Sequence, residues 1–305
     1  MKPKSSHISF IIPAYNCADT IEEAVDSIAS GNIERGDEVI IVDDGSTDST
    51  RTVLQRLLRK YDFIRLIRHT TNRGGGAARN TAVENARNEL LFCLDSDNVL
   101  EINTIPKLKQ FIQDNEADAA ALRELWYFSE RKDLVTHKWV FREGQTTLAD
   151  YLSGHVVAGA SGNYMFTKQS WARAGGYPEF AGALDAWGFG FRQVATGQKM
   201  MVMPVGGYYH RHGHASYWVR ESKKGQTSLT ALQIVIPFLS LIVDRDVNYM
   251  MGARSRYTWF DHLDKRPVRI KGAPQGYSGC VLDSRVTPES RYGAALQRIG
   301  FRMFR

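Results

Sequence analysis

The stretch Leu90–Asp97, which reads LLFCLDSD, joins an apolar run to two closely spaced carboxylates. A short apolar run is typical of a strand that is buried on both faces. Two carboxylates about 5 Å apart repel each other by roughly 3 kcal/mol at an effective dielectric constant of about 20. A divalent cation such as Mg²⁺ or Mn²⁺ would relieve this repulsion, since both ions prefer oxygen ligands. Alone, the triplet Asp95-Ser96-Asp97 is at least as typical of a solvated turn that caps the next helix.

Strand-like and helix-like patterns alternate through the first half of the chain. Further buried strands are predicted at Ile8–Pro13, Glu38–Val42 and Ile64–Ile67. Helices are predicted after the capping-box pair Thr20 and Glu23, over Ser49–Tyr61, and over Ala77–Ala86. This alternation favours an α/β fold with a mostly parallel central sheet and helices on both faces.

Polar side chains follow three of these strands, at the point where each strand ends. They are Tyr15 and Asn16, Asp43 and Asp44, and Asp95 and Asp97. In such sheets, ligands bind beyond the carboxyl ends of the strands. The glycine-rich segment Asn72–Asn80 leads into a helix, and amide donors at a helix N-terminus favour anions. Its spacing matches neither a Walker A loop nor a dinucleotide-binding G-x-G-x-x-G loop.

The second half of the chain has a less regular pattern. A hairpin is predicted over Trp126–Phe141, a strand over Gly159–Thr167, a helix over Ala186–Ala195 and a last strand over Met200–Val205. A long helical segment and a basic tail follow from Glu221. Within it, the apolar stretch Leu229–Val243 contains Pro237 and falls short of the roughly 20 residues that span a bilayer, so a buried helix is the better interpretation.

The chain has 305 residues, a net charge of +6 and 43 % apolar residues, which suits a globular protein. The basic charge is concentrated in Met251–Arg305, with eleven Lys or Arg against four Asp or Glu. Such a tail suits nucleic acid, anionic lipid or an acidic substrate, or is an ordinary solvated surface. The three cysteines are widely separated, which predicts a reducing compartment and a cytoplasmic protein. Met1–Ser6 is not followed by the apolar run of a signal peptide.

Four segments, in this order and spacing, resemble the N-terminal half of glycosyltransferase family 2. They are Ile11–Asn16, Val42–Asp48, Asn72–Asn80 and Leu94–Asp97. The resemblance implies a GT-A fold, a nucleotide-sugar donor, most commonly a UDP-sugar, and transfer that inverts the anomeric centre. It also implies a divalent metal, Mn²⁺ or Mg²⁺.

The resemblance further implies roles for individual residues on the donor side. The nucleotide-sugar-binding set is Pro13, Tyr15, Asn16, Asp43, Asp44, Arg73, Arg79, Asp95 and Ser96. Within this set, Pro13 and Tyr15 should line the nucleobase pocket, and Asp43 should hydrogen-bond the base. Asp95 should lie near the ribose and phosphates, and Asp97 should hold the metal. Arg79 should steady the donor pocket or tie loops together, and either Arg73 or Arg211 could add positive charge at the phosphates.

On the acceptor side, Gly162–Phe166 and Gly175–Glu179 resemble the family segment that precedes a Glu-Asp pair. The pair reads Leu184-Asp185 here, so only Asp185 matches the general base that takes the proton of the acceptor hydroxyl. Trp187 could stack on an acceptor sugar or belong to the core.

Two departures from the family pattern concern the metal. The usual Asp-Ser-Asp-Asp ends here in Asn98, and Tyr209–His214 follows the downstream Tyr-Arg-x-His pattern only loosely. We expect His212 to complete the metal shell, with His210 and His214 as rivals.

These features predict a GT-A catalytic domain over residues 1–218 and a helical, basic extension over 219–305. Residues 1–100 would bind the nucleotide sugar, and 101–218 a saccharide or lipid-linked acceptor in polysaccharide biosynthesis. The closest alternative is a nucleotidyltransferase that forms a nucleotide sugar. A non-catalytic binding module is a second, although the tail lacks the interleaved aromatics of single-strand binders, so no nucleic acid is expected. Peripheral membrane contact through Arg298, Arg302 and Arg305 is also open.

Overall fold

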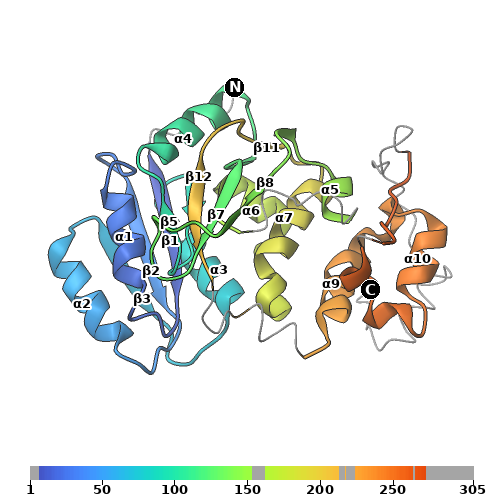
Figure 1. Cartoon of the computed structure of the whole chain (residues 1–305), viewed down its shortest axis with the longest axis horizontal. Helices are drawn as coiled ribbons and strands as arrows, with labels where there is room; N and C mark the ends of the chain where they lie inside the picture. The colour runs from blue at the N-terminus through green and yellow to red at the C-terminus, as the bar shows by residue number, and fades with distance from the viewer. Residues whose placement is uncertain (1–6, 153–161, 213–216, 218–223, 264, 273–305) are drawn as a thin grey trace. The chain divides into compact units, whose positions relative to one another are not determined.

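The computed structural model describes residues 7–152, 162–212, 217, 224–263 and 265–272 (Figure 1). The chain forms two compact units, and the first comprises residues up to Thr146 together with Val157–Glu221. The second comprises Thr147–Val156 and the residues from Ser222 onward. The sequence patterns gave no sign that the segment after Thr146 joins the second unit.

The first unit is built on an eight-stranded sheet with the order β3-β2-β1-β4-β10-β6-β11-β9. Its strands are β1 (Ile8–Ala14), β2 (Glu38–Asp43), β3 (Ile64–Arg68), β4 (Leu90–Cys93), β6 (Ala119–Ala121), β9 (Gly144–Gln145), β10 (Tyr164–Thr167) and β11 (Met200–Val202). The four strands predicted in the first half are β1 to β4, and they pair in parallel. The predicted α/β GT-A architecture is therefore confirmed.

Parallel pairing is interrupted at β10, which runs antiparallel to both β4 and β6, and it resumes between β6 and β11. The sequence predicted a strand there but not its direction, because periodicity carries no information on pairing. The edge strands of this sheet are β3 and β9. On β3, Arg65 forms an ion pair with Glu38 of β2, with Nη1 and Oε2 2.8 Å apart. Charged side chains on an edge strand disfavour pairing with another chain.

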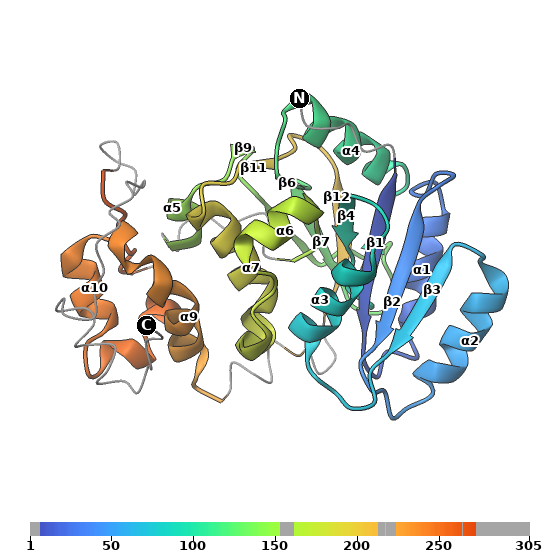
Figure 2. The same ribbon diagram turned by 180° about the vertical axis from the view of Figure 1, so that it is seen from behind.

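Helices cover both faces of the sheet, and α1 and α3 lie on opposite faces (Figures 1 and 2). The helices of this unit are α1 (Ile21–Ala29), α2 (Thr50–Lys60), α3 (Gly75–Asn85), α4 (Thr104–Asp114), α6 (Lys168–Ala174) and α7 (Asp185–Ala195), with the 3₁₀ helix η1 (Glu179–Leu184). The predicted capping box at the start of α1 does not form. The Thr20 hydroxyl donates to the Cys17 carbonyl instead of capping the helix.

A second, four-stranded sheet with the order β5-β12-β7-β8 lies in the same unit. Its strands are β5 (Val99–Leu100), β7 (Glu124–Phe128), β8 (His137–Val140) and β12 (Gly207–Arg211). The predicted hairpin over Trp126–Phe141 is the antiparallel pair β7 and β8. The sequence missed β12, because it expected the sheet to end near Val205 and read the histidines beyond as a loop.

The second unit is helical, with α5 (Leu148–Leu152), α9 (Thr227–Val235), α10 (Asp244–Met250) and the 3₁₀ helices η2 (Ile236–Leu241), η3 (Ser255–Tyr257) and η4 (Phe260–His262). The predicted long helix is divided between α9 and η2, as expected where Pro237 removes a backbone donor. Trp259 is fully buried, and its indole N–H donates to the Ser228 carbonyl at 2.9 Å.

No helix in the described parts of the chain is long and apolar enough to span a membrane. Cys17 and Cys93 are buried free thiols, whereas Cys280 lies outside the described residues. The basic tail from residue 273 onward, with Arg298, Arg302 and Arg305, also lies outside them. The cytoplasmic location and the membrane contact therefore remain predictions.

Candidate active site

The carboxyl ends of β1, β2 and β4 lie at one edge of the main sheet (Figure 2). Ala14 at the end of β1 pairs with Asp43, and Ile11 pairs with Cys93. The polar residues that follow these strands are thus brought to neighbouring positions, as the strand-end argument predicts.

The loop after β1 is fixed to the loop after β2 through Asn16. This residue has a left-handed backbone with φ of 48°, which asparagine tolerates better than most side chains. Its side-chain oxygen accepts the backbone N–H of Thr47 at 2.8 Å. Its backbone N–H donates to the Ser46 hydroxyl at 3.0 Å. Tyr15 beside it is 44 % exposed, and Pro13 is partly exposed. An open tyrosine at this edge suits the predicted nucleobase pocket.

Asp43 is almost fully buried at the end of β2. Its carboxylate accepts the Ser46 amide at 2.9 Å and lies 3.4 Å from Nε of Arg68. The role of Asp43 in binding the nucleobase stays a prediction.

Asp44 has different surroundings from Asp43. Its carboxylate binds Nδ1 of His69 at 2.6 Å and accepts the amides of Arg73 and Gly74 at 2.9 and 2.8 Å. These contacts hold the glycine-rich loop at the start of α3. In the structure, Asp44 thus supports the loop, whereas the sequence suggested that it binds the nucleotide sugar.

Arg79 on α3 joins two carboxylates from distant parts of the chain. Nη1 donates to Asp185 at 2.6 Å, and Nη2 donates to Asp95 at 2.6 Å. The arginine is only 9 % exposed, so both ion pairs are largely shielded from water. Arg79 connects the predicted donor side with the predicted acceptor side.

Glycines at the start of α3 make this close approach possible. A Cβ at Gly75 would lie 2.7 Å from Nη1 of Arg79 and 2.9 Å from Oδ2 of Asp185. A Cβ at Gly76 would lie 3.2 Å from Cα of Glu179. A side chain at Gly75 would therefore displace the Arg79–Asp185 pair, and one at Gly76 would press on the backbone of η1.

Asp95 is held on its other side by Asn163 at the start of β10. The Asn163 side chain donates to the Asp95 carboxylate at 2.7 Å and accepts the Asp95 amide at 3.0 Å. It also accepts from the Asn98 side chain at 3.1 Å. Burial opposes ionisation of Asp95, but Arg79 and Asn163 outweigh it, and His210 adds to their effect, so the pKa of Asp95 lies below its usual value. Asn163 belongs to the family-like segment Gly162–Phe166, but no role was predicted for it.

Asp97 lies beside Asp95 in the loop after β4. Burial and the neighbouring Asp95 raise its pKa to about 7, and Arg211 and Arg79 only partly oppose this. A carboxylate in that state fits the binding of a cation, which would replace the proton. In the described parts of the chain, no three His, Cys, Asp or Glu side chains form a ready-made metal site. Most ligands would then come from water and a bound diphosphate, as is common for Mg²⁺.

The predicted metal histidines are placed differently from one another. Nε2 of His212 lies 2.9 Å from the Thr136 hydroxyl, on the β7–β8 hairpin. The charge of His210, by contrast, acts on Asp95. His214 lies outside the described residues. Of the two described histidines, the structure therefore associates His210 with the acidic site, although the sequence favoured His212.

Arg73 and Arg211 were the two candidates for a phosphate contact. The side chain of Arg211 donates to Glu23 and to the carbonyls of Asp97 and Ser129, so it braces the loop after β4. Arg73 is half exposed, with Nη2 3.7 Å from Glu179. Arg73 is thus the more available of the two.

Asp185 begins α7, where helix amides favour a negative charge. One carboxylate oxygen accepts from Arg79, and the other accepts the Ala186 amide at 2.6 Å. Burial raises the pKa of Asp185 although Arg79 opposes it. A carboxylate with a raised pKa is a stronger base than an exposed one. Trp187, two residues on, is half-buried and stacks on Phe191 with ring centroids 5.4 Å apart.

Asn80 fixes the turn that carries the acceptor-side segment. Its side-chain oxygen accepts the Trp171 indole N–H and the Tyr177 amide, both at 2.9 Å. Its amide nitrogen donates to the Tyr177 carbonyl at 3.0 Å. No separate role was predicted for Asn80 from the sequence. Ser96, which it placed in the donor site, hydrogen-bonds the thiol of Cys17, and burial raises the pKa of that thiol to about 11.

Comparison with known proteins gives one matching family. The sequence profile described as glycosyl transferase family 2 matches residues 9–175. A poly(ribitol-phosphate) β-glucosyltransferase of Bacillus spizizenii is 37 % identical over 113 residues, which cover 36 % of this chain and 18 % of the relative. The poly(ribitol-phosphate) β-N-acetylglucosaminyltransferase TarP of Staphylococcus aureus is 26 % identical over 53 % of this chain and 49 % of its own length. The matches thus span half or less of these curated relatives.

Solved structures share the fold at low sequence identity. Residues 1–349 of Staphylococcus aureus TarS in complex with UDP-GlcNAc have a TM-score of 0.59 and 21 % identity, and the match covers 77 % of this chain and 72 % of that fragment. Mannosyltransferase PcManGT from Pyrobaculum calidifontis, in complex with GDP-Man and Mn²⁺, has a TM-score of 0.55 and 19 % identity, covering 85 % of this chain and 72 % of its own.

Proposed function

Because the chain belongs to glycosyltransferase family 2, we propose that it transfers a sugar from a nucleotide-diphosphate donor to an acceptor hydroxyl. The observation that carries the proposal is the buried Arg79, which joins Asp95 and Asp185. An acceptor-side base and a donor-side carboxylate held by one guanidinium are suited to a single displacement at the anomeric carbon. Such a displacement inverts that centre.

On the donor side, Tyr15 and Asp43 would bind the nucleobase at the ends of β1 and β2. Arg73 would add positive charge at the phosphates. Asp95, fixed by Arg79 and Asn163, would orient the ribose and diphosphate. Asp44 would contribute indirectly, by holding the amides of the loop before α3.

On the acceptor side, Asp185 would accept the proton of the attacking hydroxyl. Its burial keeps water out and makes it more basic than an exposed aspartate. The hydrogen bonds from Arg79 and the Ala186 amide would fix its orientation. Preorganisation of this kind can lower a barrier by several kcal/mol, on the order of 7–11 in the best cases.

Asp97 would hold a divalent cation, together with donor oxygens and water. When bound, Mn²⁺ or Mg²⁺ would offset the charge that develops on the leaving diphosphate. The relative PcManGT, which was solved with Mn²⁺, supports a metal of this class.

The relatives also support a more specific proposal on substrates. TarS was solved with UDP-GlcNAc, and two curated relatives are named poly(ribitol-phosphate) glycosyltransferases. We therefore propose a UDP-sugar as donor and a growing cell-surface polymer as acceptor. Whether the acceptor presents a sugar ring or a polyol is considered below.

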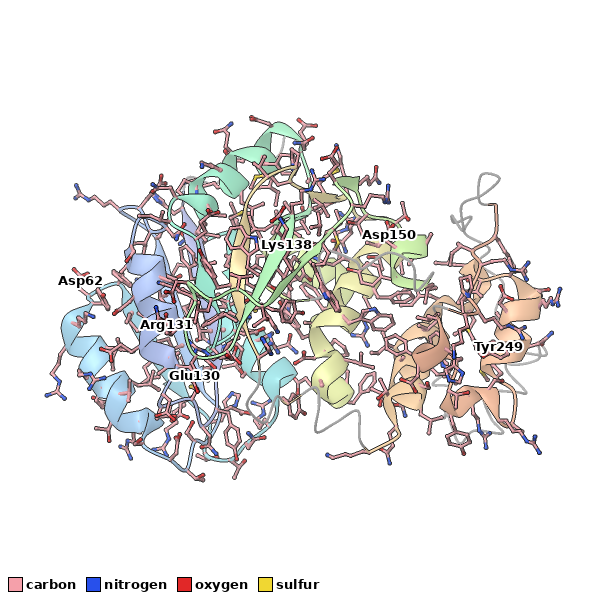
Figure 3. The ribbon with its side chains drawn as sticks, in the orientation of Figure 1. Asp62, Glu130, Arg131, Lys138, Asp150 and Tyr249 are labelled. Carbon is pink, nitrogen blue, oxygen red and sulfur yellow. The ribbon has the colours of Figure 1, made fainter. Side chains whose placement is uncertain are left out.

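A thermal-shift screen tests the donor side. UDP-glucose, UDP-GlcNAc and GDP-mannose would each be added with Mn²⁺ or with chelator. A ligand at about 100 times its Kd stabilises the folded state by about 2.7 kcal/mol, so a true donor should raise Tm clearly. The Asp97→Asn variant should lose the Mn²⁺-dependent part of the shift, and Asp62→Asn, at the exposed aspartate labelled in Figure 3, should keep it.

Product analysis separates this function from its closest alternative. The preferred donor should yield free nucleoside diphosphate and a glycoside of inverted configuration. A nucleoside triphosphate with a sugar 1-phosphate should yield no nucleotide sugar. Nucleotide-sugar synthesis in that control would overturn the proposal in favour of a nucleotidyltransferase.

A further inference from the structure

Four ring side chains form a continuous row on one face of the four-stranded sheet. We call Tyr208, His210, Tyr127 and Trp139 the aromatic row. Successive ring centroids lie 6.4, 4.7 and 5.7 Å apart. The strand register accounts for the row, because His210 pairs with Tyr127 across β12 and β7, while Leu125 pairs with both Tyr208 and Trp139. Paired residues in neighbouring strands share a face of the sheet.

The inner end of the aromatic row reaches the candidate active site. Tyr208 is 2 % exposed, and its hydroxyl accepts the Asn163 amide at 3.4 Å. Asn163 is the residue whose side chain holds Asp95. His210, the next ring, is close enough to Asp95 to act on its charge. The row therefore starts beside the groups proposed to bind the donor.

The outer end of the aromatic row reaches the surface on the edge strand β8, which pairs with β7 (Figure 1). Trp139 is 44 % exposed there, and Leu134 and Val135 in the preceding part of the hairpin are also exposed. Figure 3 shows Lys138 on β8 and Arg131 in the hairpin turn. Exposed apolar side chains gathered beside a polar site are typical of a ligand-binding surface.

The turn of the β7–β8 hairpin is held against α1, the helix that follows β1. Lys132 lies 3.9 Å from Glu23 on α1, and Arg211 binds both Glu23 and the Ser129 carbonyl. Because the hairpin is anchored at its turn, the aromatic row keeps its position relative to Asp95. A surface leading away from the reacting centre suits the part of an acceptor that precedes the sugar carrying the attacking hydroxyl.

We propose that the aromatic row binds a neutral pyranose ring of the acceptor chain, with Trp139 and Tyr127 stacked on its C–H face. The proposal rests on the proposed glycosyltransferase function and specifies the acceptor as a saccharide. Aromatic rings with polar edges combine apolar contact with hydrogen bonding, which matches a sugar ring. An open-chain polyol phosphate has no ring face to stack on these side chains, so the row favours a sugar ring.

Saturation-transfer NMR on the full chain with UDP and Mn²⁺ tests the proposal. The probes are cellotetraose, N-acetylchitotetraose and a poly(ribitol phosphate) chain. At least one tetrasaccharide should bind, and Trp139→Ala should weaken it about tenfold, as for a central aromatic contact. Trp139→Phe should retain most of the affinity. The control Val140→Ala, at the adjacent exposed side chain on the opposite face, should change nothing.

The outcomes are distinguishable from failure of the proposed function. UDP affinity, measured in the same samples, should be equal in all variants. With UDP bound, the inference is overturned if neither tetrasaccharide binds, if Trp139→Ala binds as wild type does, or if only poly(ribitol phosphate) binds. If UDP itself fails to bind, the proposed function is contradicted and this inference with it.

Discussion

Arg79 and Asp185 form a buried ion pair with Nη1 and Oδ2 2.6 Å apart, although 106 residues separate them in the sequence. The same guanidinium holds Asp95 with its other nitrogen. Three charged groups thus share one site, and a single guanidinium compensates two carboxylates. A lysine, with a single ammonium, cannot present two donors in this fixed fork geometry.

Replacement of Arg79 should therefore be costly even when charge is conserved. Arg79→Ala would leave two buried carboxylates without their cation, which should lower the free energy of unfolding by about 3–5 kcal/mol. Arg79→Lys should remain folded but lose most transfer activity, because only one carboxylate can be held. Urea denaturation and initial-rate assays on both variants would measure this. Wild-type turnover in Arg79→Lys would show that the bridge is not needed for catalysis.

The raised pKa of Asp97 predicts how stability depends on pH. Its pKa is about 7 in the folded protein, whereas the unfolded chain loses that proton near pH 4. Between these values the folded state binds the extra proton, so the free energy of unfolding of the cation-free protein falls as pH rises. Asp97→Asn removes this effect. The Tm of the variant minus that of wild type, measured with chelator, should thus be more positive at pH 8 than at pH 5.

The control for this experiment is Asp62→Asn, which should show the same Tm difference at both pH values. Added Mn²⁺ should stabilise wild type at pH 8 and have little effect at pH 5, where the ion competes with a proton. A pH-independent difference for Asp97→Asn would mean that Asp97 is ionised throughout.

Gly75 predicts a substitution that harms the site more than the fold. Alanine is a better helix former than glycine by about 1 kcal/mol, so Gly75→Ala should be tolerated by α3 itself. Its Cβ would nevertheless push on the Arg79–Asp185 pair. Transfer should fall at least about tenfold, since small displacements of reacting groups are costly. Circular dichroism and rates should be compared with Glu84→Ala, an exposed position on the same helix. Unchanged rates would show that the pair can shift freely.

Asn163 should act on the donor side alone. Asn163→Ala leaves the Asp95 amide and the Asn98 side chain without this partner, at a cost of about 1–3 kcal/mol. Because Asp95 loses its orientation, kcat/KM for the donor should fall, and KM for the acceptor should stay constant. Steady-state kinetics with each substrate varied would measure this, with the exposed Asn85→Ala as control. An equal effect on the acceptor KM would point to general disruption.

The sequence was sufficient for the elements whose burial follows from local pattern. β1 and β2 are almost entirely apolar and lie in the middle of a sheet, so their runs of Ile and Val identify them directly. The direction of β10 and the existence of β12 depend on pairing between distant strands. No local period encodes that pairing, and β12, which reads GYYHR, has no alternation of apolar and polar residues.

The site was predictable to the extent that chemistry is visible in residue type. Asp95 and Asp97 stand out because two acids directly follow a buried strand, and Asp185 stands out because it matches the general base of the family pattern. Asn163 and Asn80 were missed because an asparagine gives no signal until its partners are known. Asp43 and Asp44 are adjacent in sequence, and only the structure separates the one near the pocket from the one that holds the loop.

The most direct measurement of the central claim compares donor binding with transfer in Asp185→Asn. The variant keeps the shape of the side chain and leaves the bond from Arg79 to Asp95 in place. Calorimetry should give a UDP affinity within about twofold of wild type, while transfer falls at least about a hundredfold, the range for loss of a general base. Wild-type transfer in Asp185→Asn, or a loss of UDP affinity as large as the loss of transfer, would contradict the separation of donor and acceptor roles.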